Sequence, residues 1–179
     1  TPFRNDSKRL EGKIIFNFSL KKAQEQGYFK KINFLPIREY DSTKADEKIA
    51  NLAVEVLTQN INSGFNQILM ARCKNQVKAE EVFRYYEQHT RFNPVLIHSD
   101  VPDKNARLER IKNKEHRIIV CVDMLGEGFD LPELQTAAFH DIRKSLPITL
   151  QFAGRFTRTS YDDELGEASF IVNIADVDV

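Results

Sequence analysis

Two arginines three residues apart, Arg155 and Arg158, lie in a run that is compatible with a helix over residues 145–158. Each residue of a helix turns by about 100°, so Gln151 and Gly154 share the face of these arginines, and the opposite face is apolar. A guanidinium binds phosphate well because its planar fork donates two parallel hydrogen bonds and stays charged. The run therefore predicts contact with a polyphosphate. The alternative is a solvent-exposed basic face that carries an incidental glycine.

A glycine-rich acidic loop is expected over residues 123–132, after the most strand-like segment of the chain. Gly126 and Gly128 permit backbone conformations that are closed to other residues. Asp130 precedes Leu-Pro, and its carboxylate in an extended chain is suited to accept hydrogen bonds from a ribose hydroxyl. The loop predicts a nucleotide contact, and the alternative is an ordinary turn with an aspartate–backbone hydrogen bond.

Short apolar runs alternate with amphipathic helical segments from about residue 66 onward. The expected strands are residues 67–71, 94–98, 117–122, 135–140 and 168–174. The expected helices are residues 78–89, 102–114 and 145–158. Such alternation predicts a three-layer α/β fold, with an open, mostly parallel sheet of about five or six strands and helices on both faces.

The first third of the chain is less regular. A strand is expected over residues 13–18, a helix over 19–26 and an extended segment over 32–40. A long helix follows over 43–62, capped by Asp41 or Ser42. We therefore expect residues 1–65 to be an N-terminal extension with a flanking helix, and residues 66–179 to be the main domain.

Ligands of open parallel sheets bind beyond the carboxyl ends of the strands. The loop at residues 123–130 leaves the carboxyl end of one expected strand, and residues 141–145 leave the carboxyl end of the next. Both segments therefore emerge on the functional edge of the sheet. This placement is the physical reason to treat them as one site.

The composition, with 41% hydrophobic and 29% charged residues, is typical of a soluble globular protein. No apolar run reaches the roughly 20 residues of a membrane span, and the polar N-terminus does not resemble a signal peptide. We expect no membrane partner. Cys73 and Cys121 lie far apart in apolar runs, which predicts buried thiols of a cytoplasmic protein, with neither a disulfide nor a metal site.

The formal net charge is zero, so the whole chain lacks the basic balance of many nucleic-acid-binding proteins. The charge is uneven, however. Residues 1–31 are rich in Lys and Arg, whereas residues 159–179 contain acids and no Lys or Arg. The asymmetry indicates either a polyanionic partner on one side or scattered, solvated surface charge.

In this order and spacing, the loop and the helical run resemble motifs V and VI of the superfamily 2 helicases. The motif VI pattern Gln-x-x-Gly-Arg-x-x-Arg is matched in full by Gln151, Gly154, Arg155 and Arg158. The motif V pattern Gly-x-Asp-x-Pro is matched by Gly128, Asp130 and Pro132. Residues 67–74 resemble motif IV, and residues 1–6 resemble the end of motif III in the DEAD/DEAH-like and type III restriction ATPase group. The resemblance covers nearly the whole chain and implies a RecA-like second domain.

This resemblance implies a role for each matching residue toward the nucleotide. Arg155 and Arg158 would be arginine fingers that reach the γ-phosphate of ATP. Gln151 would contact that phosphate or its attacking water. Gly128, Asp130 and Gly154 would lie beside the ribose and the phosphates.

The resemblance also implies contacts with the backbone of a nucleic-acid strand. They are expected from Arg72 in motif IV and from the turn at His98 and Ser99. The start of the glycine-rich loop, Asp123 and Met124, would contribute as well. For Arg72 and His98 the alternative is a surface residue at a strand end. We expect DNA, rather than RNA, as the strand.

Two motifs of complete motors of this kind are absent from the sequence. There is no Gly-x-x-x-x-Gly-Lys-[Ser/Thr] phosphate loop and no Asp-Glu-x-[His/Asp] motif for Mg²⁺. In the family both belong to the first RecA-like domain, which would hold ATP and Mg²⁺. We therefore expect a P-loop NTPase fold without its own P-loop, the second domain of a larger helicase or translocase. On its own it should bind ATP poorly and hydrolyse none.

Two other functions were weighed against this one. The first is a non-catalytic α/β module that binds nucleic acid or protein through the basic N-terminal third. The second, a small-molecule enzyme, has little support, because there is no nucleophile elbow and the four histidines show no metal-ligand spacing. His140, at an expected strand end, is interpreted as a packed side chain.

Overall fold

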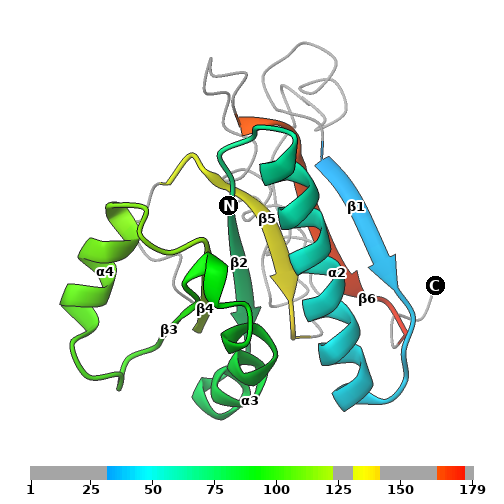
Figure 1. Ribbon diagram of the computed structural model, residues 1–179. Coiled ribbons are helices and arrows are strands. Elements are labelled where there is room, and N and C mark those ends of the chain that lie inside the picture. The colour runs from blue at the N-terminus through cyan, green and yellow to red at the C-terminus, as the bar shows by residue number, and fades with distance from the viewer. Residues whose placement is uncertain (1–31, 123–130, 142–164, 176–179) are drawn as a thin grey trace, which may run out of the picture.

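The computed structural model describes residues 32–122, 131–141 and 165–175 of the chain (Figure 1). Within these residues a single six-stranded sheet has the order β1-β6-β5-β2-β4-β3, and every neighbouring pair is parallel. The strands are β1 (Ile32–Ile37), β2 (Ile68–Cys73), β3 (Val95–Ile97), β4 (Ile118–Val122), β5 (Leu134–Phe139) and β6 (Ala168–Asn173). The predicted parallel α/β architecture is confirmed.

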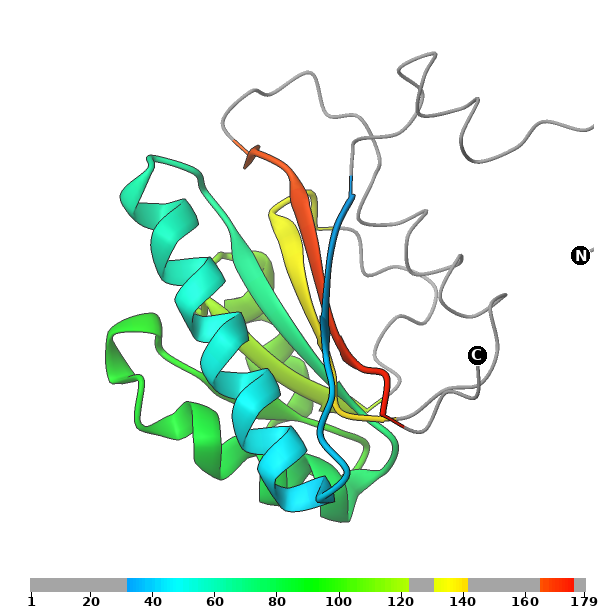
Figure 2. The ribbon, with the colours of Figure 1, turned by 90° about the vertical axis from the view of Figure 1, so that its right-hand side faces the viewer.

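Helices cover both faces of this sheet. They are α2 (Ser42–Asn62), α3 (Gln76–Glu87) and α4 (Lys104–Lys112), with a short 3₁₀ turn at Thr90–Phe92. The α2 and α3 helices share one apolar cluster with alternate residues of the strands, and Figure 2 shows α2 running along that face. On α4, Ile111 belongs to a second cluster, formed by the strand residues that point the other way. The alternation of side chains along each strand therefore divides the core into two layers.

The longest helix, α2, follows from a clear local signal. Its N-cap is Asp41, whose side chain accepts hydrogen bonds from the backbone N–H groups of Thr43 and Lys44. An apolar stripe at helical spacing then packs on the sheet, with Ile49, Ala53 and Leu57 buried. The helix ends at Asn62 with Ser63 as its C-cap, and the next residue, Gly64, adopts a positive φ of 90°.

The other two helices begin at different residues from those that the spacing of apolar residues predicted. The α3 helix begins at Gln76 and not at residue 78, because Asn75 caps it by accepting a hydrogen bond from the Lys78 N–H. The α4 helix begins at Lys104 and not at residue 102, because Asp103 has a left-handed backbone with φ of 56°. The helices expected at residues 78–89 and 102–114 are thus present, with shifted bounds.

The central strand β2 is buried along its whole length, as expected of a parallel strand covered on both faces. Burying one Leu or Ile side chain contributes roughly 1.5–3 kcal/mol, and Leu69 and Ile68 face opposite layers. Cys73 and Cys121 are both buried, which confirms the burial predicted for them. Burial raises the pKa of the Cys73 thiol.

The boundary expected at residue 65 falls between α2 and β2. The α2 helix packs on β5, β6 and β2, and β1 pairs in parallel with β6, so both belong to the same sheet domain as the later strands. The segments expected at 13–18, 19–26 and 145–158 lie outside the described residues. In the described part of the chain, no helix has both the length and the apolar character that crossing a bilayer requires.

Candidate functional site at the carboxyl edge of the sheet

All six strands of the described sheet run the same way, so their carboxyl ends lie along one side, which we call the carboxyl edge. The residues that follow these ends include Lys74 after β2, His98 after β3, and His140 and Asp141 after β5. Because ligands of open parallel sheets bind at this edge, these side chains are candidates for contact with a ligand.

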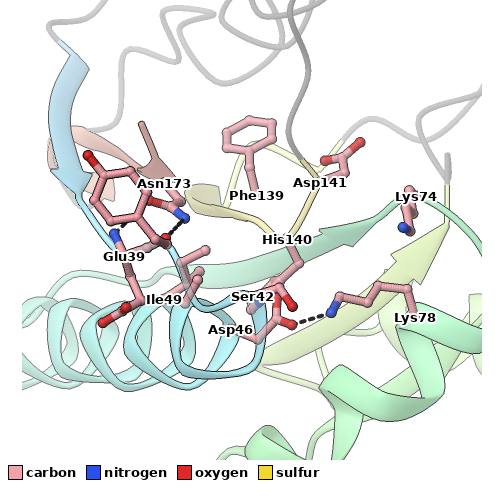
Figure 3. Close-up of a pocket in the computed structure, with 12 residues that line it drawn as sticks. Glu39, Ser42, Asp46, Ile49, Lys74, Lys78, Phe139, His140, Asp141 and Asn173 are labelled. Carbon is pink, nitrogen blue, oxygen red and sulfur yellow. Dashed lines mark hydrogen bonds and ion pairs between the residues drawn. The ribbon is translucent and has the colours of Figure 1, made fainter. Parts of the chain in front are cut away.

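A cavity of about 390 Å³ lies at the carboxyl edge (Figure 3). It is lined by the start of α2 and by residues at the ends of β1, β2, β5 and β6, including Tyr40, Ser42, Lys74, Phe139 and Asn173. Its acidic side chains already have partners: Glu39 pairs with Lys48, Asp46 with Lys78, and Asp141 with Arg72. A small ligand would have to compete with these ion pairs. The pairs belong to a network of buried polar side chains, which is the main feature of this edge.

Asp46 is the centre of this network. Its carboxylate accepts a hydrogen bond from His140 Nδ1 at 2.9 Å and forms an ion pair with Lys78 of α3, which Figure 3 marks with a dashed line. Burial acts to raise the pKa of Asp46, but the hydrogen bonds from His140 and Lys78 more than offset it, and the pKa lies below its usual value. Asp46 is therefore a buried carboxylate that stays ionised at neutral pH.

The protonation state of His140 follows from its two partners. Burial lowers the pKa of this imidazole, although the neighbouring Asp46 acts in the opposite direction, so the ring is neutral at pH 7. A carboxylate only accepts hydrogen bonds, which assigns the ring proton to Nδ1. The Tyr86 hydroxyl, 2.9 Å from Nε2, then donates to the imidazole. One protonation state satisfies Asp46, His140 and Tyr86 together.

A second buried pair adjoins the first. Arg72, whose side chain is 1% exposed, donates from its guanidinium to Asp141 Oδ2 at 2.5 Å. The backbone N–H of His140 donates to the Arg72 carbonyl, so β2 and the end of β5 are held together by side chain and backbone. His140 and Asp141 thus connect the end of β5 with α2, α3 and β2.

Two of the residues predicted to contact nucleic acid, Arg72 and His98, are buried. Arg72 is an interior side chain in an ion pair, so it is not the surface residue of the alternative interpretation, and a phosphate contact would require that pair to open. His98 is also buried, with Nδ1 accepting from the Asp100 N–H and Nε2 lying 3.6 Å from Glu80. The nucleic-acid contacts of both residues stay predictions.

Ser99 is the member of this set that reaches the surface. It is exposed in the turn after β3, and its hydroxyl accepts a hydrogen bond from Gln76 Nε2 at 2.5 Å. The neighbouring Asp100 has a lowered pKa because hydrogen bonds from Ser99 and Gln76 favour its charged form. The turn after β3 and the start of α3 therefore form one exposed polar surface.

The remaining predicted site residues lie outside the described residues. They are Asp123, Met124, Gly128, Asp130, Gln151, Gly154, Arg155 and Arg158. Their neighbours in sequence are well defined: β4 ends at Val122, directly before the glycine-rich segment, and β5 ends at Phe139. Within residues 32–122, 131–141 and 165–175, no three His, Cys, Asp or Glu side chains gather as a metal site would require.

A family model described as the helicase conserved C-terminal domain matches residues 47–160, which include the glycine-rich segment, the arginine pair and the partners of Asp46 in the network, but not Asp46 itself. The chain belongs to this family. The expected resemblance to superfamily 2 helicases is confirmed.

Individual relatives of this helicase C-terminal domain are distant. The uncharacterized protein ML1624 of Mycobacterium leprae (strain TN) is 26% identical over 95 residues, which are 53% of this chain and 16% of that protein. The solved C-terminal domain of the DEAD-box protein Dbp5 matches with a TM-score of 0.52 at 13% identity, covering 83% of this chain and 78% of that one. The structural likeness confirms the RecA-like fold.

Sequence reasoning missed Asp46 and the position of its partners in this helicase domain. A signal was available, because Asp46 lies on the same helical face as Ile49, Ala50 and Ala53, where an acid interrupts an apolar stripe. Such an acid has to find a cationic or donor partner when it is buried. The interpretation of His140 as a packed side chain is confirmed, since it is buried and hydrogen-bonded on both nitrogens.

Proposed function

We propose that this helicase C-terminal domain is the second motor domain of an ATP-dependent nucleic-acid helicase or translocase. The observation that carries the proposal is the full match of Gln151, Gly154, Arg155 and Arg158 to the helicase arginine motif, inside the region that the family model matches. In sequence this run follows β5, whose carboxyl end lies at the edge where ligands of parallel sheets bind.

In this proposal a first RecA-like domain of the same parent protein holds ATP and Mg²⁺, because this sequence contains no phosphate loop. ATP supplies the phosphoanhydride bond whose hydrolysis drives the motor. Arg155 and Arg158 donate hydrogen bonds to the phosphate oxygens and stabilise the negative charge that develops on them. Gly128, Asp130, Gln151 and Gly154 position the nucleotide.

Contact with the strand is proposed at the turns after β2, β3 and β4. Exposed Lys74 and Ser99 and the first turn of α3 support this placement, because a cation, a hydroxyl and helix N–H groups are all suited to phosphate. Asp123 and Met124, together with Arg72 and His98 at their strand ends, complete the proposed contacts. Phosphate contacts carry little sequence information, so we expect weakly sequence-specific, salt-dependent binding.

We propose DNA as the strand and the cytoplasm as the location. The proposal of the cytoplasm rests on Cys73 and Cys121, which are buried in the apolar sheet as is typical of structural thiols in a reducing compartment. The choice of DNA rests on the resemblance of the sequence to the type III restriction ATPase group. Comparing DNA and RNA as activators of the parent protein tests it directly.

The decisive experiment measures the ATPase kcat of the full-length parent protein with DNA, with RNA and without nucleic acid. Arg155→Ala and Arg158→Ala should each lower kcat by about 10³-fold or more, the effect typical of an arginine finger. Arg110→Ala, at an exposed position of α4, is the matched control and should keep wild-type turnover. The 179-residue domain alone should hydrolyse no ATP.

The outcomes separate the motor from the alternatives. Wild-type kcat in both arginine variants would refute the arginine-finger role, and turnover by the isolated domain would refute its role as a second half. If the parent protein binds DNA or a protein but never hydrolyses ATP, the domain is a binding module.

A further inference from the structure

The network around His140 links two parts of the domain that the proposed function uses separately. Lys78 lies in the first turn of α3, beside the turn proposed to contact the strand, and it pairs with Asp46. Asp46 accepts from His140, which directly precedes the segment that carries the arginines in sequence. The path from Lys78 through Asp46 to His140 therefore joins the start of α3 to the end of β5.

Burying this network costs free energy of desolvation, which is hard to explain if its only role is to stabilise the fold. The side chain of His140 is 0% exposed and that of Asp46 is 7% exposed, so the charge of Asp46 is largely desolvated. Replacing buried ionic groups by well-packed apolar ones is often neutral or stabilising. The apolar layer formed by α2, α3 and the sheet adjoins these groups through Tyr86, so apolar side chains at their positions would extend that layer. A role beyond stability accounts for their presence.

We propose that His140 is a positioning residue that couples nucleic-acid binding at the start of α3 to ATP turnover by the segment after β5. The inference rests on the proposed function and deepens it. When α3 shifts upon contact with the strand, Lys78 moves the Asp46 carboxylate, and the hydrogen bond to His140 Nδ1 transmits that shift to the end of β5. The neighbouring Arg72–Asp141 pair gives the same end a second connection, to β2.

Two substitutions separate the two hydrogen bonds of His140. The amide nitrogen of an asparagine lies near the position of Nδ1 and can donate to Asp46, whereas the amide oxygen of a glutamine can take the position of Nε2 and accept from the Tyr86 hydroxyl. His140→Asn therefore keeps the hydrogen bond to Asp46 and loses the one from Tyr86. His140→Gln keeps the hydrogen bond from Tyr86 and loses the one to Asp46. His116 offers a matched control, because as a whole residue it is as buried as His140, and it bonds the backbone carbonyl of Asn93, far from the carboxyl edge.

The experiment uses the full-length parent protein and measures linkage in both directions. The Kd for single-stranded DNA is measured with and without a non-hydrolysable ATP analogue, and the Kd for the analogue with and without DNA. Linkage requires the two ratios to agree. We expect His140→Gln to reduce the coupling ratio by about fivefold or more, while either affinity alone changes by less than about twofold. DNA stimulation of kcat should fall in parallel.

The control variants make the result specific. His140→Asn should restore most of the coupling, and His116→Gln should keep all of it at a similar melting temperature. Full coupling in His140→Gln would overturn the inference, and so would an equal loss in His116→Gln, because general loosening would then explain the effect. If the wild-type parent protein shows no DNA-dependent ATP turnover, the proposed function fails and this inference fails with it.

Discussion

The two edges of the sheet bury polar side chains in different ways. At the amino edge, Gln67 is the hub: its Oε1 accepts from Asn60 at 2.8 Å and from Thr136 at 3.1 Å. Its amide nitrogen donates to the Leu165 carbonyl at 2.6 Å. Every group in this set is neutral, and the bonds join α2, β5 and the segment before β6.

At the carboxyl edge the corresponding hub, Asp46, is a charge. Its partners are an imidazole and an ammonium group, His140 and Lys78, and the adjoining pair of Arg72 and Asp141 is also ionic. A neutral network depends little on pH or on nearby charges, whereas an ionic one responds to both. The amino edge also holds an ion pair, between Glu133 and Lys114, so the comparison concerns the two networks and not the whole edges. It assigns architecture to the neutral Gln67 network and responsiveness to the ionic Asp46 network, which lies at the edge where the proposed ligands are polyanions.

The largest effect on stability is expected from Asp46→Ala. This substitution leaves Lys78 and His140 without their shared partner, and breaking one side of a buried ion pair typically costs about 3–5 kcal/mol. Urea denaturation of the domain gives the change in the free energy of unfolding. Glu109→Ala, which breaks the exposed pair with Lys112, is the control and should cost no more than about 0.5 kcal/mol. Equal losses in both variants would contradict the special role of the carboxyl edge.

A smaller loss is expected from Gln67→Ala at the amino edge. The substitution strips a hydrogen-bond partner from Asn60 and Thr136, and buried groups left unsatisfied cost about 1–3 kcal/mol in total for a neutral site of this kind. The same urea titration measures it. A loss of unfolding free energy that is constant between pH 5 and 8 would support the difference between the two networks. A loss that varies with pH, as expected at the carboxyl edge, would contradict it.

The smallest effect is the pH dependence contributed by His140. Its pKa in the folded domain lies below the ordinary value of 6.5, so the unfolded chain binds the proton first as pH falls. This contribution is therefore complete above pH 6.5 and is lost on acidification below it, at no more than about 1.4 kcal/mol per pH unit. His89, with a pKa also lowered by burial, adds to the same slope.

The difference between wild type and His140→Gln isolates the contribution of His140, since His89 is common to both proteins. Thermal or urea unfolding at pH 7.5, 6.5 and 5.5 should show a shallower slope in the variant. Identical slopes would mean that His140 titrates alike in the folded and unfolded states, and the carboxyl edge would then not be the pH-sensitive one.

Much of the fold was predictable from the sequence because the signals are local. Asp41 caps α2, an apolar stripe continues it, and β-branched runs such as Ile118–Val122 form strands. The starts of two helices were predicted wrongly because each depends on a single residue. Asn75 caps α3, and Asp103 before α4 has a left-handed conformation. The spacing of apolar residues does not reveal such backbone geometry. The arginine and glycine motifs were recognised by spacing, and the family match supports the domain type that they predicted.

The carboxyl-edge network was not predictable, since its members are far apart in the chain. Asp46 and His140 are separated by 94 residues, and Arg72 and Asp141 by 69. They meet because β5 lies next to β2 under the start of α2, and strand order is not encoded in any one segment. Arg72 illustrates the consequence: the resemblance to motif IV implied a contact with nucleic acid, and the alternative was a surface residue at a strand end, whereas pairing with Asp141 places the side chain in the interior.

By itself, the sequence determined the helices and strands, the parallel α/β class and the motifs that identify a helicase C-terminal domain. These depend on the periodicity of apolar residues and on caps and spacings within a few turns of chain. The tertiary structure alone decided which charges are buried and which partners they have. Burial and pairing arise from contacts between distant segments, and the low polarity of the interior makes each buried charge depend on its partner.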